Sequence, residues 1–237
     1  MPHDPQLAVG SLVFDDLDQI DLTGPFEVLS RLPGAVHKLY ARTVNPVRDT
    51  RGLRIMPDAA LGDAPRLDIL HVPGGPGQQA LMHDEVVLEW LRAQAGGAHR
   101  VLSVCTGALL LGAAGLLRGR RATTHWNSFH LLPLFGAVPV DERVVIDGNW
   151  VFTAGVTAGI DGALRLAAGM YGDALAQRIQ LYMAYAPEPP FDSGTPDTAP
   201  AEVLAAVRAA SADLTARREA TARGIAARLG IEAPEKG

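Results

Sequence analysis

The sequence has a single cysteine, two lysines and no long apolar segment. Because Cys105 stands alone among 237 residues, an intrachain disulfide and a thiolate-rich metal site are both excluded. The two lysines, Lys38 and Lys236, fall in a predicted strand and in the tail of the chain, which argues against Schiff-base chemistry. Apolar runs are short and broken by glycine, so we expect no membrane span, and the first residues lack the pattern of a signal peptide.

The chain also lacks an excess of positive charge. Its formal net charge is −5, whereas a nucleic-acid-binding surface is basic, so we expect no nucleic-acid partner. A lone cysteine is typical of a reducing compartment, and we expect a cytoplasmic protein. Apolar residues, in contrast, are plentiful. They make up 48% of the chain, which is enough for the core of one sizeable domain.

Predicted strands and helices alternate along the chain. Strand patterns cover residues 7–14, 37–43, 68–72, the stretch before Cys105, 144–146 and 150–153, and a hairpin surrounds Gly52. Helix patterns begin at Asp21 and after Cys105, and cover residues 84–95, 127–135, 160–171, 173–183 and 201–229. This alternation predicts an α/β fold in which a mostly parallel sheet is covered by helices on both faces, as a three-layer sandwich.

We expect residues 1–237 to form a single domain. Residues 186–200 are rich in proline and predict a linker, and the helix 201–229 is expected to pack on the domain. That helix is rich in arginine. We interpret these arginines as a solvated face rather than a surface for acidic partners; they are Arg217, Arg218, Arg223 and Arg228.

Cys105 lies where a β-branched stretch passes directly into a helical one. A cysteine at the end of a strand and the start of a helix meets unpaired backbone amides and the positive end of the helix dipole, which favour the thiolate. The alternative is a buried structural thiol, because free cysteine is among the most buried residue types.

Other polar segments follow predicted strands and therefore meet Cys105 at the carboxyl edge of the sheet, where α/β folds bind ligands. The backbone amides of the Gly74-Gly75 turn are suited to stabilising negative charge on a substrate, although a tight turn alone also explains the glycines. Around the cysteine we expect substrate contacts from Gly74, Gly75, His125, Trp126, Val156 and Thr157.

Asp21 differs from the acidic residues that precede it. Asp15 and Asp16 are typical of a solvated loop, whereas Asp21 is flanked by Ile20 and Leu22 and is expected to point into an apolar setting. Burial and a neighbouring thiolate would raise the pKa of such a carboxyl, so that it holds a proton at neutral pH. Asp21 is therefore predicted to act as a general acid.

The histidines and serines of the sequence limit which catalytic base, metal site or serine nucleophile the chain can provide. His125 is either a base for the cysteine or a structural, substrate-lining group, and the sequence leaves both open. His125 and His130 lack metal-ligand spacing on a helix and His71 sits in a strand, so we expect no metal site. No Gly-x-Ser-x-Gly pentad is present, which argues against a serine hydrolase.

Residues 19–25, 72–75, 103–107, 121–126 and 185–191 carry a resemblance to a known family. In them the chain resembles the ThiJ/PfpI superfamily, whose fold is the flavodoxin-like, class I glutamine-amidotransferase-like sandwich with a cysteine on a nucleophile elbow. It is most similar to the isonitrile (isocyanide) hydratase branch. Asp21 in place of glutamate, and Thr106 in place of histidine, count against the peptidase and glyoxalase branches.

The resemblance implies a lyase that converts an isonitrile and water into an N-substituted formamide, as a homodimer and without a cofactor. Cys105 would attack the terminal carbon to give a covalent thioimidate, Asp21 would protonate that carbon, and Thr106 would orient Asp21. Two alternatives stay open: a cysteine-based redox or stress sensor, and a glyoxalase or deglycase acting on small aldehydes.

Overall fold

The central element of the molecule is a seven-stranded sheet in the order β10-β11-β7-β6-β1-β2-β5. The structure is a computed structural model and describes residues 6–232. The strands are β1 Leu7–Leu12, β2 Ala35–Ala41, β5 Ala59–Ala60, β6 Ile69–Val72, β7 Arg100–Val104, β10 Val144–Asp147 and β11 Trp150–Thr153. Only β10 runs antiparallel to its neighbour in this sheet, which confirms the predicted mostly parallel arrangement.

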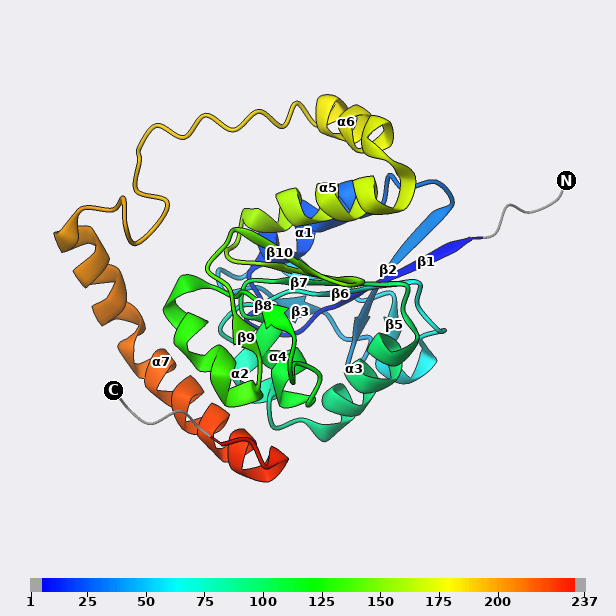
Figure 1. Ribbon diagram of the computed structural model, residues 1–237. Coiled ribbons are helices and arrows are strands. Elements are labelled where there is room, and N and C mark those ends of the chain that lie inside the picture. The colour runs from blue at the N-terminus through cyan, green and yellow to red at the C-terminus, as the bar shows by residue number, and fades with distance from the viewer. Residues whose placement is uncertain (1–5, 233–237) are drawn as a thin grey trace, which may run out of the picture.

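Helices cover both faces of this sheet, as Figure 1 shows. One layer contains α1 Gln19–Leu29, α5 Ala158–Tyr171 and α6 Asp173–Tyr182. The opposite layer contains α2 Gln78–Leu81, α3 Glu85–Gly97, α4 Gly107–Ala113, the 3₁₀ helix η2 Trp126–Phe135 and α7 Ala201–Leu229. Five further short elements lie outside the main sheet: η1 Leu61–Asp63, the strand pair β3 Val47–Arg48 with β4 Arg54–Ile55, and the strand pair β8 Arg121–Ala122 with β9 Val138–Pro139.

The middle strands are buried along their whole length because both of their faces are covered. Every residue of β6 and β11 is buried, and so is β7 after its first residue. A strand of this kind shows a continuous apolar run instead of the alternation of a half-exposed strand. The sheet thus separates two apolar clusters, one under each helical layer.

Four elements differ from the predictions. The helix expected at 127–135 is a 3₁₀ helix that contains Pro133, which lacks the N–H of a regular helical turn. The first helix begins at Gln19 rather than Asp21, because Asp18 caps it by accepting a hydrogen bond from the N–H of Ile20 at 3.1 Å. The short α2 and β5 have too few residues to give a periodic pattern.

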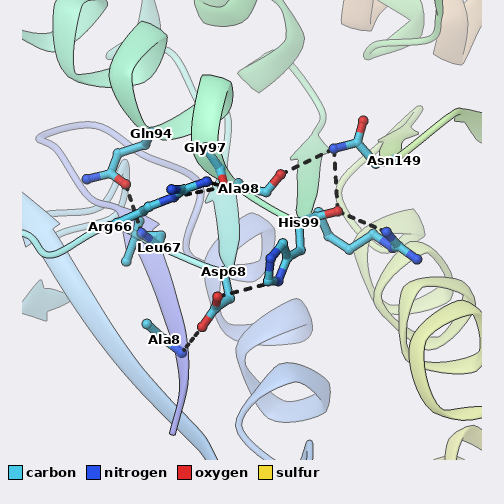
Figure 2. Close-up of polar contacts among 10 residues, drawn as sticks. Ala8, Arg66, Leu67, Asp68, Gln94, Gly97, Ala98, His99 and Asn149 are labelled. Carbon is cyan, nitrogen blue, oxygen red and sulfur yellow. Dashed lines mark hydrogen bonds and ion pairs between the residues drawn. The ribbon is translucent and has the colours of Figure 1, made fainter. Parts of the chain in front are cut away.

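The amino ends of the middle strands are held by side-chain hydrogen bonds, which Figure 2 shows. The Asp68 carboxylate accepts a hydrogen bond from the N–H of Ala8 at 2.8 Å. The Gln94 amide accepts from the N–H of Leu67 at 3.0 Å and donates to the carbonyl of residue 65 at 2.9 Å. Asn149 donates to the carbonyl of residue 98 at 3.3 Å. We call Asp68, Gln94 and Asn149 the amino-end clamp.

Residues 183–200 form an arm that connects α6 to α7, and Figure 1 shows it arching away from the body of the molecule. Beyond the arm, α7 returns and packs along η2. There the Asn127 amide donates hydrogen bonds to the hydroxyls of Ser211 and Thr215 at 2.8 and 3.1 Å. None of the helices between residues 6 and 232 has the length and apolar character needed to cross a membrane.

Candidate active site

Cys105 occupies the sharp turn between β7 and α4, at the carboxyl edge of the sheet. Its φ of 54° is in the left-handed region, which a residue with a side chain adopts only when its surroundings hold it there. The Cys105 N–H donates to the carbonyl of Thr153 at 3.1 Å, and its carbonyl accepts from the Thr124 hydroxyl at 2.7 Å. The side chain is only 6% exposed. The elbow predicted from the sequence is therefore present, and β11 and Thr124 fix its backbone.

Asp21 lies in the first turn of α1 and is completely buried. Its Oδ2 accepts a hydrogen bond from the N–H of Gly74 at 3.0 Å, whereas Oδ1 is buried without a partner in residues 6–232. A side chain at position 74 would not fit, since a Cβ atom there would lie 2.9 Å from Asp21 Oδ2 and 2.5 Å from the N atom of Thr106. Gly74 thus lets the turn approach both residues closely.

Thr106 is bonded to the same turn. Its hydroxyl oxygen accepts from the N–H of Gly75 at 3.1 Å, and the hydroxyl also lies 3.4 Å from the Gly75 carbonyl. The sequence predicts that Thr106 bonds directly to Asp21 and that both glycine amides face a substrate. In this structure Thr106 instead holds the turn, and the two amides are already used by Asp21 and Thr106. The turn therefore holds Asp21 and Thr106 through its two backbone amides.

The carboxyl and the thiol perturb each other. Burial, with a contribution from Asp18, raises the pKa of Asp21 to about 7, although the neighbouring Cys105 thiol and the hydrogen bond from Gly74 work in the opposite direction. Burial and then the charge of Asp21 raise the pKa of the Cys105 thiol well above its ordinary value. The pair therefore loses its first proton near pH 7 and its second at much higher pH.

The predicted effect of the helix start on the thiol has the correct direction, but it is outweighed at this site. The helix that follows Cys105 has only seven residues. The N–H of Thr106, at the start of this helix, lowers the pKa of the thiol. Burial and the charge of Asp21 raise that pKa by more. The prediction for Asp21 has both the correct direction and the correct main cause, which is desolvation.

His125 stands at the entrance of η2 and is neutral. Burial and the charge of Arg218 lower its pKa to about 4. Its Nδ1 accepts a hydrogen bond from the N–H of Asn127 at 3.3 Å, which assigns the ring proton to Nε2. Within residues 6–232 no hydrogen bond joins His125 to Cys105, so this geometry favours a lining or donor role over that of a base.

The remaining predicted substrate contacts are not equally placed. Trp126 is half-buried, with its ring 5.3 Å from that of His125. Val156 is half-buried and packs against the apolar cluster that contains Cys105. Thr157 is exposed instead, and its hydroxyl accepts a hydrogen bond from Arg143 at 3.1 Å. The structure thus brings Val156 to the Cys105 side of the sheet and directs Thr157 outward.

Comparison with known proteins identifies the family. Residues 8–168 match the DJ-1/PfpI family. The chain belongs to this family. An isonitrile hydratase of Pseudomonas putida is 50% identical over 221 residues, which cover 93% of this chain and 97% of that protein. A glutathione-independent glyoxalase of Caenorhabditis elegans is 30% identical over 161 residues, which cover 67% of this chain and 85% of that protein.

Solved structures of DJ-1/PfpI proteins agree with this assignment. The crystal structure of a ThiJ/PfpI family protein from Pseudomonas syringae matches with a TM-score of 0.89 and 38% identity, covering 93% of this chain and 92% of that one. The predicted superfamily and its flavodoxin-like fold are therefore confirmed.

One residue near the DJ-1/PfpI elbow was missed at the level of sequence. Arg218 of α7 is only 5% exposed and donates a hydrogen bond from Nη2 to the carbonyl of Gly75 at 3.2 Å. The interpretation of the α7 arginines as a solvated face is wrong for this residue, because α7 lies against the site and turns Arg218 inward. A polar residue within an otherwise Ala-rich helix gives no signal of this placement.

The site contains no obvious metal-binding group. Among residues 6–232, no three His, Cys, Asp or Glu side chains come together as a set that could hold a metal ion. Cys105 and Asp21 are accompanied by the neutral groups Thr106 and His125 and by the cation Arg218.

Proposed function

We propose that this DJ-1/PfpI protein hydrates isonitriles to N-substituted formamides, with Cys105 as the nucleophile and Asp21 as its acid–base partner. The observation that carries the proposal is the buried carboxyl of Asp21, with a pKa of about 7, next to the thiol of a strained elbow. The 50% identity to an isonitrile hydratase over almost the whole chain supports the substrate class.

In the first half-reaction the Cys105 sulfur bonds to the terminal carbon of R–N≡C. The same carbon gains a proton, which gives the thioimidate R–N=CH–S–Cys105. That proton is the one shared by the pair, and Asp21 delivers it. The reactive state is consequently the one in which Cys105 and Asp21 together hold a single proton, a state that is populated above pH 7.

In the second half-reaction water adds to the thioimidate carbon. Asp21, now ionised, accepts a proton from the water as the C–O bond forms and passes it to the nitrogen. The hydroxyl of the tetrahedral adduct R–NH–CH(OH)–S–Cys105 then gives up its proton, which Asp21 transfers to the departing sulfur, and the product is R–NH–CHO. The site returns to its starting protonation state, so the net change is the addition of one water to the isonitrile. The reaction needs no redox cofactor or metal.

Two other functions predict different results. The relationship to a glyoxalase would favour chemistry on small aldehydes, whereas a redox sensor needs a thiol that oxidises readily. The raised pKa of Cys105 is unfavourable for a sensor, because oxidants react with the thiolate. Turnover of methylglyoxal with inert isonitriles would favour the glyoxalase, and reversible sulfenate formation without turnover would favour the sensor.

The test is an assay of formamide formation from a simple aryl isonitrile by the wild type, Cys105→Ala and Ser103→Ala. Ser103 is the matched control, because it is buried two residues before the cysteine and its hydroxyl has no partner in the described part of the chain. We expect no detectable turnover in Cys105→Ala and near-wild-type turnover in Ser103→Ala. Full turnover in Cys105→Ala would exclude covalent catalysis by this cysteine.

We also propose that the protein is a homodimer. Support comes from the region around the arm, where Leu181, Tyr182 and Phe191 are 81%, 72% and 78% exposed. A cleft of about 1640 Å³ lies between the arm, α5, α6 and β10, and exposed apolar patches of this kind mark protein interfaces. Light scattering should give twice the chain mass; a concentration-independent monomer would contradict this part of the proposal.

The chain is further proposed to be a single domain, 1–237, in the cytoplasm. The single-domain proposal is supported by α7, because Ala222, Ile225 and Ala226 belong to the same apolar cluster as the sheet. One cooperative unfolding transition is the expected result, and two separated transitions would contradict it. The location is supported by the free thiol of Cys105, and cell fractionation tests it.

A further inference from the structure

Arg218 is a buried cation with no part in the reaction described above. It comes from α7, on the far side of the arm, and is 5% exposed, whereas the neighbouring Arg217 is exposed. Removing a guanidinium from water costs several kcal/mol unless its donors and its charge are both compensated. The hydrogen bonds and neighbouring charges of Arg218 therefore indicate what compensates its burial.

All three hydrogen bonds from Arg218 go to neutral acceptors. Nε donates to Gln78 Oε1 at 3.0 Å, Nη1 to the Ser128 hydroxyl at 3.4 Å and Nη2 to the Gly75 carbonyl at 3.2 Å. No carboxylate of residues 6–232 forms an ion pair with this guanidinium. Each guanidinium nitrogen thus has an acceptor, while no acidic side chain of the described residues compensates the positive charge.

The uncompensated charge faces the thiol. The Arg218 charge lowers the pKa of Cys105, acting against burial and Asp21. Besides Arg218, the ionisable groups around Cys105 are Asp21 in α1, Asp18 at the start of α1, and the neutral His125. Among these groups, Arg218 is therefore the positive charge that stabilises the Cys105 sulfur when it becomes an anion.

The hydrogen bond from Arg218 to Gly75 also connects Arg218 to the turn that contacts Thr106 and Asp21. The Gly75 carbonyl accepts from Arg218, and the N–H of the same residue donates to Thr106. The preceding N–H, that of Gly74, donates to Asp21. Gly75 has a φ of +128°, which glycine adopts without strain and a residue with a side chain rarely does, so the conformation of this flexible turn is set by its contacts. Arg218 is one of them.

We infer that Arg218 is a positioning residue of the active site, which fixes the Gly74-Gly75 turn and presents a buried positive charge to the Cys105 thiolate. α7 is then a functional part of the site and not only a cover for η2. The effect on turnover rests on the proposed function, but the effect on the thiol is independent of any substrate.

The experiment compares Arg218→Gln with Arg217→Gln, its exposed neighbour on the same helix. The rate of Cys105 alkylation by iodoacetamide is measured from pH 7 to 12, because burial raises the pKa of this thiol, and circular dichroism checks the fold at each pH. We expect the midpoint of the pH profile to rise by roughly one pH unit in Arg218→Gln and to stay unchanged in Arg217→Gln. A purely structural arginine would change the melting temperature alone, so an unchanged midpoint in folded Arg218→Gln would overturn the inference.

Arg218→Lys covers the case in which Arg218→Gln does not fold. Lysine keeps the charge but lacks the planar set of donors that joins Gln78, Ser128 and Gly75. We expect a midpoint close to that of the wild type and a kcat lowered severalfold, with a smaller change in KM. Wild-type kcat in Arg218→Lys would overturn the positioning role. If wild-type protein leaves isonitriles unchanged, the proposed function fails, while a shifted alkylation midpoint in Arg218→Gln still supports the inference.

Discussion

The two ends of the central sheet are built in opposite ways. At the amino ends of the strands, the clamp residues Asp68, Gln94 and Asn149 give and accept hydrogen bonds that tie neighbouring segments together (Figure 2). At the carboxyl ends, Asp21 Oδ1 is buried without a partner in the described chain, and Cys105 has a φ of 54°. The clamp groups at the amino ends are matched, whereas the carboxyl ends include one unmatched carboxylate oxygen and one strained residue.

The difference separates stability from chemistry on a single scaffold. Buried polar groups are nearly always hydrogen-bonded, so an unpartnered buried carboxylate oxygen does not add to stability. Strained backbone persists only where the surrounding structure enforces it. We therefore expect substitutions in the clamp to lower stability and leave the reaction intact, and substitutions of Asp21 to do the reverse.

The largest expected effect is that of Asp21→Asn on turnover. Asparagine keeps the shape of the side chain and an acceptor for Gly74 but cannot carry the proton, so kcat should fall by about 10²–10⁴-fold. Asp16→Asn is the control, because Asp16 is exposed and its φ of 58° suits asparagine. The measurement is steady-state formamide production, and a kcat of Asp21→Asn within twofold of wild type would remove Asp21 from the chemistry.

A substitution in the amino-end clamp should lower stability and leave turnover unchanged. Gln94→Ala leaves the N–H of Leu67 and the carbonyl of residue 65 without their partners, and we expect the free energy of unfolding to fall by about 2 kcal/mol. Urea titration measures this change. The exposed Gln177→Ala on α6 should stay within about 0.5 kcal/mol of wild type. A parallel loss of kcat in folded Gln94→Ala would mean that the two ends are not separable.

The pH dependence of stability tests the cost of burying Asp21. Its pKa is raised on folding, from 3.8 to about 7, so its protonated form stabilises the fold fully below about pH 4. That contribution is lost as the pH rises through 7. Asparagine cannot ionise, and Asp21→Asn should therefore exceed wild type in free energy of unfolding by about 2 kcal/mol more at pH 8 than at pH 5. Equal pH profiles for both proteins would show that the carboxyl is not desolvated.

Whereas the contribution of Asp21 to stability falls as the pH rises through 7, the rate of the reaction should increase over the same pH range. The reactive pair holds one proton and is formed when the first proton leaves near pH 7, so kcat/KM should rise about tenfold between pH 6 and 8. Rate profiles with an aryl isonitrile measure this. A kcat/KM that falls over this interval would mean that the fully protonated pair is the active state.

Much of the fold and the centre of the site were predictable from local patterns. The apolar runs of the middle strands and the rule that parallel strands end at one edge placed Cys105, Asp21 and the glycine turn together. Asp21 was distinguishable from Asp15 and Asp16 only through its apolar neighbours, and the structure confirms that it is buried. These predictions succeed because each depends on a short segment and on the topology of the sheet.

The rest depended on contacts between distant segments. Arg218 is one of five arginines in its helix, and only the return of α7 after the arm makes it different from Arg217. The partner of Thr106 depends on the path of the Gly74-Gly75 turn, which the sequence marks as a turn but does not place. Thr157 was expected near the substrate from its position after a strand, but the start of α5 directs it to Arg143.

The most direct test of the account is the mass of Cys105 during turnover. Wild-type protein is mixed with an excess of an aryl isonitrile, quenched in acid within milliseconds to seconds, digested and analysed by mass spectrometry. We predict that the peptide containing Cys105 gains the mass of one isonitrile, that this adduct decays as formamide appears, and that Cys105→Ala gives none. Steady formamide production with unmodified Cys105 at every time point would contradict the central claim that the strained, buried thiol forms the bond to carbon.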